Sequence, residues 1–494
     1  MKRFFSFLII FFAFIFSISS FWHLEQESDR DSPEINFPSP EIIALRTRID
    51  NILEPYLTKD YQIGLKVISL TTPQVLYSYN DEQPLTPASN LKLITTSAAY
   101  NLLGSNFIWQ TDIYADDDNN IYLQASGDPT FTAKGLESLF KAMADSLRYY
   151  RSSRIRGNFY VDQGSFHDSA IGYGWRTSNL SNTYSSKPTA LAFEENCAQV
   201  VIKPTKINSP PVIEIFPVDT GFEIVNKSLT TPWKKEQNII VAVDSLANKL
   251  VISGRIWEKS KPQWRSFAVQ KPDLYALSIV GKKLQEQKMI IEGGVHYTSL
   301  REEAYQDRKY QKLFTIQSGC LQEVISEINQ KSNNFMANQL YLTIGQKVGL
   351  APQSHIYIKQ FLTQNKIDST SLTMYDGSGL SRYNQCSPDL LVQILKFMAN
   401  SPDFTGFYQS LAVTGTTGTL KAFKNPLLAN KVHAKTGYII GARALSGYLM
   451  TQDGNLLAFS FMINKEKSQL NNFYDLAEQI LLELVLLEKA TQVY

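Results

Sequence analysis

The sequence has few of the residues that bind metals or form disulfides. Its 494 residues include five histidines and only three cysteines, Cys197, Cys320 and Cys386. The cysteines form no CxxC pair and the histidines no HExxH motif, so the pattern argues against a metal cluster and allows at most one disulfide. We therefore expect chemistry that uses no metal and no other cofactor.

The chain also lacks a long block of charge of one sign. Lys and Arg total 48, Asp and Glu total 46, and the net charge is only +2. Nothing in this balance resembles a nucleic-acid footprint. The hydrophobic fraction of 44% is that of a globular protein with a sizeable core, and the length indicates two to three domains. Composition and net charge therefore do not indicate a binding partner, and any partner must be inferred from a specific site in the sequence.

Long apolar runs are missing except at the start of the chain. Lys2 and Arg3 precede a run, Phe4 to Ile18, that is apolar apart from two serines. This run is short for a bilayer span and ends in small residues, which is typical of a signal peptide, predicted here as residues 1–19. We expect export to the periplasm or the outer face of the cytoplasmic membrane. An uncleaved anchor, with peripheral membrane or cell-wall association, stays open.

The rest of the chain is patterned as one α/β domain with a β-rich interruption. Near the N-terminus, YQIGLKVISL and PQVLYSYN predict a strand hairpin, and a helical pattern then runs to Gly104. From about residue 109, short β-rich runs separated by Pro, Gly, Asn and Asp dominate. We expect the α/β domain at 20–108 and 305–494, an inserted region at 109–304, and a nested subdomain at about 190–265.

The C-terminal part supplies further elements of that domain. KTGYIIGARALSGYLM and NLLAFSFMIN are two apolar runs around Gln452-Asp453-Gly454, which predicts a hairpin whose first strand opens with Lys435-Thr436-Gly437. LNNFYDLAEQILLELVLLEK has apolar residues at helical spacing and predicts a closing helix.

One helix carries a pair of residues that could do chemistry. In TPASNLKLITTSAAY, Ser89 precedes Lys92 by three residues, so a helix beginning at Ser89 places both side chains on one face. A serine hydroxyl needs a nearby base, and a lysine can serve once burial or neighbouring positive charge lowers its pKa. In the alternative, Ser89 caps the helix and Lys92 extends outward to solvent.

Two later motifs favour the chemical interpretation. Lys435-Thr436-Gly437 places a cation and a hydroxyl on a strand where glycine allows close approach, and Ser332-Asn333-Asn334 lies between two helical runs. Each has a structural alternative, an exposed strand edge and a helix cap. Together, and in this order, they match the Ser-x-x-Lys, Ser-x-Asn and Lys-Thr-Gly set of penicillin-recognising serine enzymes.

The large insertion between the first two motifs narrows this resemblance. The chain resembles the class C low-molecular-mass penicillin-binding proteins, the D-alanyl-D-alanine carboxypeptidase/endopeptidases of the penicillin-binding protein 4 type. The stretches SGDPT (126–130), YDGSGLSRYN (375–384) and TGTTGTL (414–420) fit the same family. The resemblance implies a transpeptidase-like domain with an antiparallel sheet flanked by helices, interrupted by one or two nested domains.

The resemblance also implies roles for the motif residues. Ser89 would form the acyl-enzyme and Lys92 would act as general base, while Ser332 would relay a proton and Asn334 would bind the peptide amide and orient Lys92. The strand motif would hold the terminal carboxylate and the acyl oxygen; its residues are Lys435, Thr436, Gly437 and Tyr438, the last through its backbone N–H together with that of Ser89.

Three further residues are implied to read the diaminopimelate side chain of the stem peptide. Arg382 would bind its carboxylate and Asp162 its ammonium group, and Phe166 is the third candidate. In the alternatives, Asp162 caps a turn and Arg382 bridges structural carboxylates. After Lys-Thr-Gly this chain has Tyr438-Ile439-Ile440, where relatives often place a small polar residue and then a glutamine, which puts in doubt the substrate side-chain contact on that edge and the preferred stem peptide.

The function implied is that of an exported serine-type D-alanyl-D-alanine carboxypeptidase acting on peptidoglycan stem peptides, with β-lactams as covalent inhibitors. The choice between carboxypeptidase and D,D-endopeptidase stays open, as does the oligomeric state. A serine β-lactamase and a non-catalytic cell-wall-binding relative are the alternatives.

Overall fold

The computed structural model describes residues 38–72, 74–149, 154–166, 172–217, 222–244 and 249–487. The predicted signal peptide, residues 1–19, lies outside these ranges. Chain contacts divide the protein into residues 1–45 with 490–494, and residues 46–489. Within the described ranges, every helix is too short or too polar to cross a bilayer.

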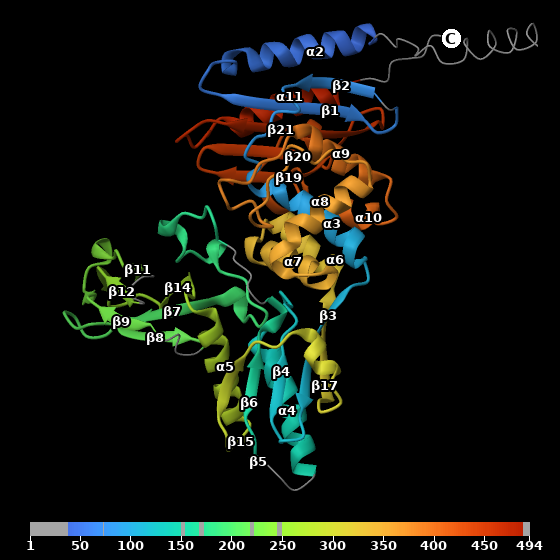
Figure 1. Ribbon diagram of the computed structural model, residues 1–494. Helices are drawn as coiled ribbons and strands as arrows, with labels where there is room; N and C mark the ends of the chain where they lie inside the picture. The colour runs from blue at the N-terminus through green and yellow to red at the C-terminus, as the bar shows by residue number, and fades with distance from the viewer. Residues whose placement is uncertain are drawn as a thin grey trace, which may run out of the picture. The chain divides into compact units, whose positions relative to one another are not determined.

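The second unit contains a six-stranded antiparallel sheet. Its strands, in spatial order, are β18 (Ala412–Val413), β19 (Val432–Ile439), β20 (Ala442–Met450), β21 (Leu456–Asn464), β1 (Gln62–Ser69) and β2 (Gln74–Tyr79). Five of them, β1, β2, β19, β20 and β21, are labelled in Figure 1. Seven consecutive residues of β21 are buried, so both faces of the sheet are covered. The predicted β1–β2 hairpin and the antiparallel sheet flanked by helices are confirmed.

The C-terminal apolar run that we expect to form one strand contains two. KTGYIIGARALSGYLM turns at Gly441, whose φ is +96°, and its halves pair with each other as β19 and β20. The predicted hairpin around Gln452-Asp453-Gly454 joins β20 to β21. Lys435-Thr436-Gly437 therefore lies inside β19 rather than at the start of a strand. Strands buried on both faces have apolar residues at nearly every position, so the sequence of β19 and β20 shows no alternation that would mark where one ends and the other begins.

Helices pack partly on this sheet and partly on one another, and they carry the serine motifs. Outside the insertion they are α2 (Pro40–Leu53), α3 (Leu91–Leu103), α6 (Leu321–Lys331), α7 (Asn334–Val348), α8 (Ser354–Gln364), α9 (Pro388–Ala399), α10 (Phe404–Ser410) and α11 (Phe473–Val485). Helix α3 contacts α6, α7, α8 and α9, and ten of its thirteen residues are buried. Gly104, with φ +85°, ends α3 as the sequence predicts.

The insertion is built on a second, five-stranded sheet. Its spatial order is β16 (Val295–Thr298), β6 (Phe159–Asp162), β4 (Ile121–Gln124), β3 (Ile108–Ala115) and β17 (Gln311–Cys320), accompanied by α4 (Ala133–Tyr149), α5 (Pro272–Glu286) and the short pair β5 (Arg154–Ile155) and β15 (Ile290–Ile291). The chain enters through β3 and leaves through its antiparallel partner β17. Strand β17 follows residue 304, the boundary expected from sequence, yet belongs to the inserted sheet.

Three smaller sheets lie within residues 197–268, close to the range expected for a nested subdomain. They are formed by β14 (Gln263–Ala268), β7 (Cys197–Lys203) and β8 (Val212–Phe216); by β11 (Ile240–Asp244), β12 (Lys249–Ser253) and β9 (Glu223–Asn226); and by β10 (Leu229–Thr231) and β13 (Arg255–Trp257).

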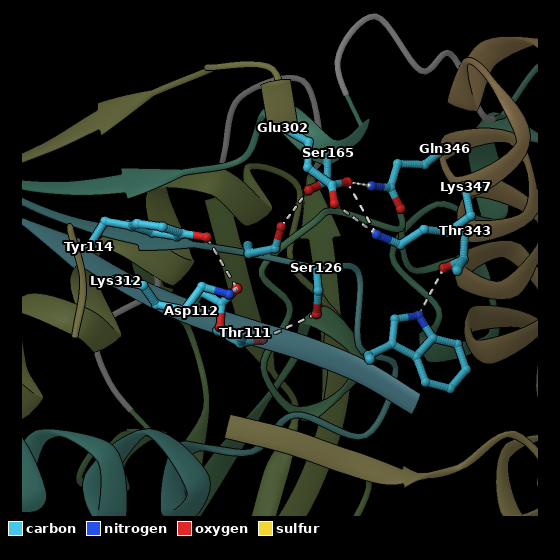
Figure 2. A network of polar contacts seen from close by, with 12 residues as sticks. Thr111, Asp112, Tyr114, Ser126, Ser165, Glu302, Lys312, Thr343, Gln346 and Lys347 are labelled. Carbon is cyan, nitrogen blue, oxygen red and sulfur yellow. Dashed lines mark hydrogen bonds and ion pairs between the residues drawn. The ribbon is translucent and has the colours of Figure 1, made fainter. Parts of the chain in front are cut away.

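A polar network fastens the inserted sheet to the C-terminal half of α7 (Figure 2). The Trp109 indole N–H donates to Thr343 Oγ1 at 3.0 Å, and Gln346 and Lys347 both bind the Glu302 carboxylate. Because α7 begins at Asn334, these contacts tie the insertion to the helix that carries the Ser-x-Asn motif.

Candidate active site

Ser89 lies in a strained turn at the mouth of α3. A single 3-10 turn, Ala88–Asn90, leads directly into the helix at Leu91, and Ser89 is half-buried. Ala88 is held at φ +46°, a conformation that costs a non-glycine residue free energy and tends to occur where function requires it. The turn presents the serine side chain without using it as a helix cap.

Lys92 points into the protein, one turn along from Ser89. Its side chain is 0% exposed, and its Nζ contacts three oxygens: Ser89 Oγ at 2.9 Å, Asn334 Oδ1 at 2.7 Å and the Ser378 carbonyl at 2.6 Å. The alternative in which Lys92 extends outward is therefore wrong.

The partners of Lys92 determine whether a neutral Lys92 amine turns an N–H group or its lone pair toward Ser89. The Ser378 carbonyl can only accept, and Asn334 turns its Oδ1 to the lysine because its Nδ2 donates to the Tyr184 carbonyl at 2.9 Å. A neutral amine has two N–H groups, which these two acceptors take up. Its lone pair is then left for the hydroxyl hydrogen of Ser89, the arrangement that a general base requires.

The surroundings favour this neutral form. Burial lowers the pKa of Lys92 well below its usual range, and the positive charge of Lys435 lowers it further, while Asp376 opposes both. Burial also lowers the pKa of Lys435 to about 7. Two buried lysines thus share one site in which both cannot easily stay charged.

Ser332 and Asn334 reach the lysines from the junction of α6 and α7, as the sequence predicts. Ser332 has φ +60°, and its Oγ accepts a hydrogen bond from Lys435 Nζ at 2.9 Å. The helix-capping role expected in the alternative falls to Asn333, whose side chain accepts from the Met336 N–H. Asn333 thus caps α7, while its neighbours Ser332 and Asn334 contact the two lysines.

The outer edge of β19 adds a surface for an extended ligand. Strand β18 pairs only with His433 and Ala434, so within the described ranges no strand covers the edge from Lys435 onward. Thr436 Oγ1 donates to Thr419 Oγ1 at 2.8 Å, which brings the 414–420 loop to the same edge. Such an edge can add an extended peptide as a further strand.

Two glycines let the surrounding chain close on the serine turn. A Cβ on Gly437 would lie 2.6 Å from the Pro87 carbonyl oxygen, and one on Gly379 would lie 1.8 Å from that of Ala88. Strand β19 and the 375–384 loop therefore flank the Ser89 turn at distances that only glycine permits.

Sequence reasoning missed the residue that organises the 375–384 loop. Asp376 is fully buried and accepts hydrogen bonds from the backbone N–H groups of Ser378, Gly379 and Ser381 and from the Trp175 indole. This carboxylate therefore positions the Ser378 carbonyl that holds Lys92. The Asp-Gly-Ser-Gly run was the available signal, since an aspartate before glycines often binds its own following amides.

The insertion contributes to the site as well. Besides the Tyr184 carbonyl on Asn334, Glu195 accepts a hydrogen bond from Asn333 Nδ2 at 2.7 Å. Burial raises the pKa of Glu195, and its backbone φ is +58°. Nothing local in the sequence indicates these long-range contacts.

The remaining predicted residues fall into two groups. Arg382 lies at the end of β19, where its Nη2 donates to the Ile440 carbonyl at 3.4 Å, and the side chain of Tyr438 is exposed on that strand. Asp162 is 1% exposed and accepts from the N–H groups of Gly164 and Leu300 and from the Tyr305 hydroxyl. Its oxygens are thus taken up within the insertion, the arrangement expected of the turn-capping alternative.

Phe166 lines a cavity of the insertion that neither Lys92 nor Lys435 borders. This space, about 870 Å³, is also bordered by Pro272, Leu274 and Tyr297. The structure therefore brings together the three motifs and Arg382 around β19, and does not bring Asp162 or Phe166 among them.

No cluster of metal-binding side chains occurs in the described ranges, and all three cysteines, which lie within them, are free. What the site offers is a hydroxyl with an adjacent amine base, a second hydroxyl on a second amine, and an open strand edge. These groups suit acyl transfer from an amide to Ser89.

Comparisons with known proteins agree on the family. The model of the D-Ala-D-Ala carboxypeptidase 3 (S13) family matches residues 45–483. A D-alanyl-D-alanine carboxypeptidase of Actinomadura sp. (strain R39) is 27% identical over 85% of this chain and 81% of its own length, and the carboxypeptidase DacB of Haemophilus influenzae is 26% identical over 83% and 86%.

The comparison with solved structures shows a similar fold. The crystal structure of penicillin binding protein 4 from Haemophilus influenzae superposes with a TM-score of 0.74 at 22% identity, covering 88% of this chain and 99% of that one. A second structure of it, complexed with a β-lactam, has a TM-score of 0.70. With the family model spanning most of its length, the chain belongs to the D-Ala-D-Ala carboxypeptidase 3 (S13) family.

Proposed function

We propose that Ser89 is the residue through which this D-alanyl-D-alanine carboxypeptidase attacks its substrate, with Lys92 as general base. The observation that carries the proposal is the hydrogen-bond set of Lys92, whose two acceptor-only partners leave its lone pair for the Ser89 hydroxyl. The enzyme class follows from the family, and this geometry supports the proposed roles.

The proposed reaction has two stages. The neutral Lys92 amine takes the Ser89 proton while Oγ attacks the penultimate D-alanine carbonyl, and the backbone N–H groups of Ser89 and Tyr438 stabilise the oxyanion. As the C–N bond breaks, the Ser332 hydroxyl gives its proton to the departing amine and takes a proton from Lys435 Nζ, which donates a hydrogen bond to it. Water then hydrolyses the ester and restores the serine.

Substrate binding follows the open edge of β19. Lys435 and Thr436, with Thr419 behind them, would hold the terminal carboxylate. Arg382, at the far end of the strand, would take a carboxylate on the third residue of the stem peptide. Export to the compartment that holds peptidoglycan belongs to this proposal. A D,D-endopeptidase activity would use the same acyl-enzyme with a larger leaving amine.

Labelling with penicillin tests the nucleophile. The wild-type protein is expected to gain the mass of one penicillin, and Ser89→Ala is expected to gain none, because no other hydroxyl faces Lys92 Nζ at hydrogen-bonding distance among the described residues. Intact-mass spectrometry measures both. Ser97→Ala is the matched control on the same helix, since the Ser97 hydroxyl is buried and has no hydrogen-bond partner. An unlabelled wild type would refute the proposal.

The lifetime of that adduct separates the proposal from a β-lactamase. We expect an ester that persists after free penicillin is removed, whereas rapid loss of the mass with turnover of penicillin would favour the β-lactamase alternative. A protein that folds but never acquires the mass would favour the non-catalytic alternative.

The pH dependence of acylation tests the coupling of the two lysines. Because the charge of Lys435 lowers the pKa of Lys92, Lys435→Met should raise that pKa. The neutral base then forms only at higher pH, so the acid limb of the acylation rate should move to higher pH, whatever happens to the maximum rate. Thr436→Val, which removes a hydroxyl but no charge from the same edge, should leave the limb in place. An unmoved limb in Lys435→Met would contradict the coupling.

A further inference from the structure

A basic groove continues from the end of β19 away from the catalytic lysines. It encloses about 840 Å³ and is bordered by Ile439, Ile440 and Gly441 at the strand end. The charged residues that line it are Lys59, Arg176, Arg382, Lys465 and Lys467 against Asp60 and Glu466. The positive groups outnumber the negative ones, so the groove attracts anions.

The acidic residues of the groove are already near lysines, whereas its two arginines lack such partners. Asp60 lies 3.9 Å from Lys465, and Glu466 lies 3.8 Å from Lys467. Among the described residues, neither Arg176 nor Arg382 has a carboxylate within ion-pairing distance, and Arg382 donates only to the Ile440 carbonyl.

The two guanidinium groups are near enough to act on each other. The positive charge of Arg176, after burial, lowers the pKa of Arg382. Two guanidinium groups that lie together without a carboxylate repel each other, which raises the free energy of the protein. A bound anion would remove this repulsion by pairing with both groups. This arrangement is typical of a site for a carboxylate-bearing ligand.

Arg176 comes from the insertion and is fixed on the catalytic body by its neighbours. The indole of Trp175 donates to Asp376 Oδ2 at 2.8 Å. A Cβ on Gly174, whose φ is +78°, would lie 2.5 Å from Ser381 Oγ and 2.6 Å from the Tyr383 ring. The backbone beside Arg176 is therefore clamped to the loop that carries Arg382, which holds the two arginines in a fixed relation.

The direction of the substrate along β19 decides what reaches the groove. If the terminal carboxylate lies at Lys435 and the scissile carbonyl at Tyr438, the preceding residues of the peptide pass Ile439 and Ile440 and enter the groove. An extended chain advances about 3.3 Å per residue, so two further residues span about 7 Å. Besides the carboxylate of the third residue, the part of a peptidoglycan stem peptide that would reach the groove carries one more free carboxylate. It is the α-carboxylate of the γ-linked glutamate, the second residue of the peptide.

We propose that Arg176 binds this α-carboxylate while Arg382 binds the carboxylate of the third residue. The inference rests on the proposed function and deepens it: the insertion makes the enzyme selective for stem peptides whose second residue is a free acid rather than an amide.

Two pentapeptide substrates that differ only at this group, α-carboxylate against carboxamide, test the inference. Wild type is expected to show a kcat/KM about tenfold higher for the acid, the size typical of one charge-assisted contact near solvent. Arg176→Gln is expected to bring the ratio of the two values to about one, and Arg176→Lys to keep part of the preference. The ratio is measured on one protein sample, so partial unfolding cancels.

Two controls make the outcomes distinct. Arg265→Gln removes the same charge from an exposed position on β14 and should retain the wild-type ratio. Arg382→Gln should also retain the acid-over-amide ratio while lowering kcat/KM for both peptides. Equal kcat/KM values in wild type, or an unchanged ratio in Arg176→Gln, would overturn the inference. Hydrolysis of neither peptide, together with no penicillin adduct, would instead overturn the proposed roles of the catalytic residues.

Discussion

Lys92→Met is expected to slow acylation of Ser89 by penicillin about 10²- to 10⁴-fold, the range that a lost general base typically accounts for. Methionine fills nearly the same buried volume, so the space around α3 stays occupied. It cannot take the Ser89 proton, and its only polar atom is a weak acceptor. The rate of mass gain under excess penicillin measures the effect.

Stability separates this loss from misfolding. The substitution leaves Asn334 Oδ1 and the Ser378 carbonyl without their donor, at about 1–3 kcal/mol for each buried group. It also removes an amine that is costly to bury, so the two changes oppose each other. We expect a folded protein by thermal unfolding. Lys141→Met, at an exposed position of α4, is the matched substitution, and a wild-type rate in Lys92→Met would refute the role of the base.

Gly379→Ala is expected to lower both stability and activity because its new Cβ would collide with the backbone of the serine turn. The nearest atom, the Ala88 carbonyl oxygen, would lie at 1.8 Å and belongs to main chain that cannot rotate away. Overpacking costs about 1–3 kcal/mol and the positive φ of +82° costs about 1–2 kcal/mol more, so the free energy of unfolding should fall by about 2–5 kcal/mol. A displaced Ser89 should acylate about 10²-fold more slowly.

Gly454→Ala isolates the collision from the backbone strain. Gly454 has almost the same φ, +83°, but a Cβ there would meet nothing within 4 Å. Its cost should be about 1–2 kcal/mol, with acylation unchanged. Urea unfolding of both variants gives the difference. If Gly379→Ala loses no more stability than Gly454→Ala and acylates normally, the loop does not support the serine turn.

The sequence predicted best those elements whose structure depends on neighbouring residues in the chain. Apolar spacing and Gly104 predict α3 because the helix buries most of its residues and needs a positive φ to end. The polar run Ser332-Asn333-Asn334 predicts that residues 321–348 form two helices rather than one, as the structure shows. The three motifs predict which residues meet, since their chemistry is useful only together.

Features that depend on distant contacts could not be predicted. The carbonyl of Tyr184 orients Asn334, and the indole of Trp175 reaches Asp376, but a backbone carbonyl and an indole N–H have no sequence signature. The family resemblance implied a ligand role for Asp162, whereas its hydrogen-bond partners Leu300 and Tyr305 come from a segment far along the chain.

The pairing of β1 with β21 affects the order in which the enzyme folds and becomes active. Residues 62–69 bond to strand partners up to Asn464, so the two ends of the catalytic body meet across the whole intervening insertion. Contacts of such high sequence separation form late and slowly. A growing chain that already contains Ser89 and Lys92 still lacks β19 and its open edge. With the role proposed for Ser89, its hydroxyl stays an ordinary alcohol until the last strands are in place, and we expect acyl transfer to begin only with the completed fold.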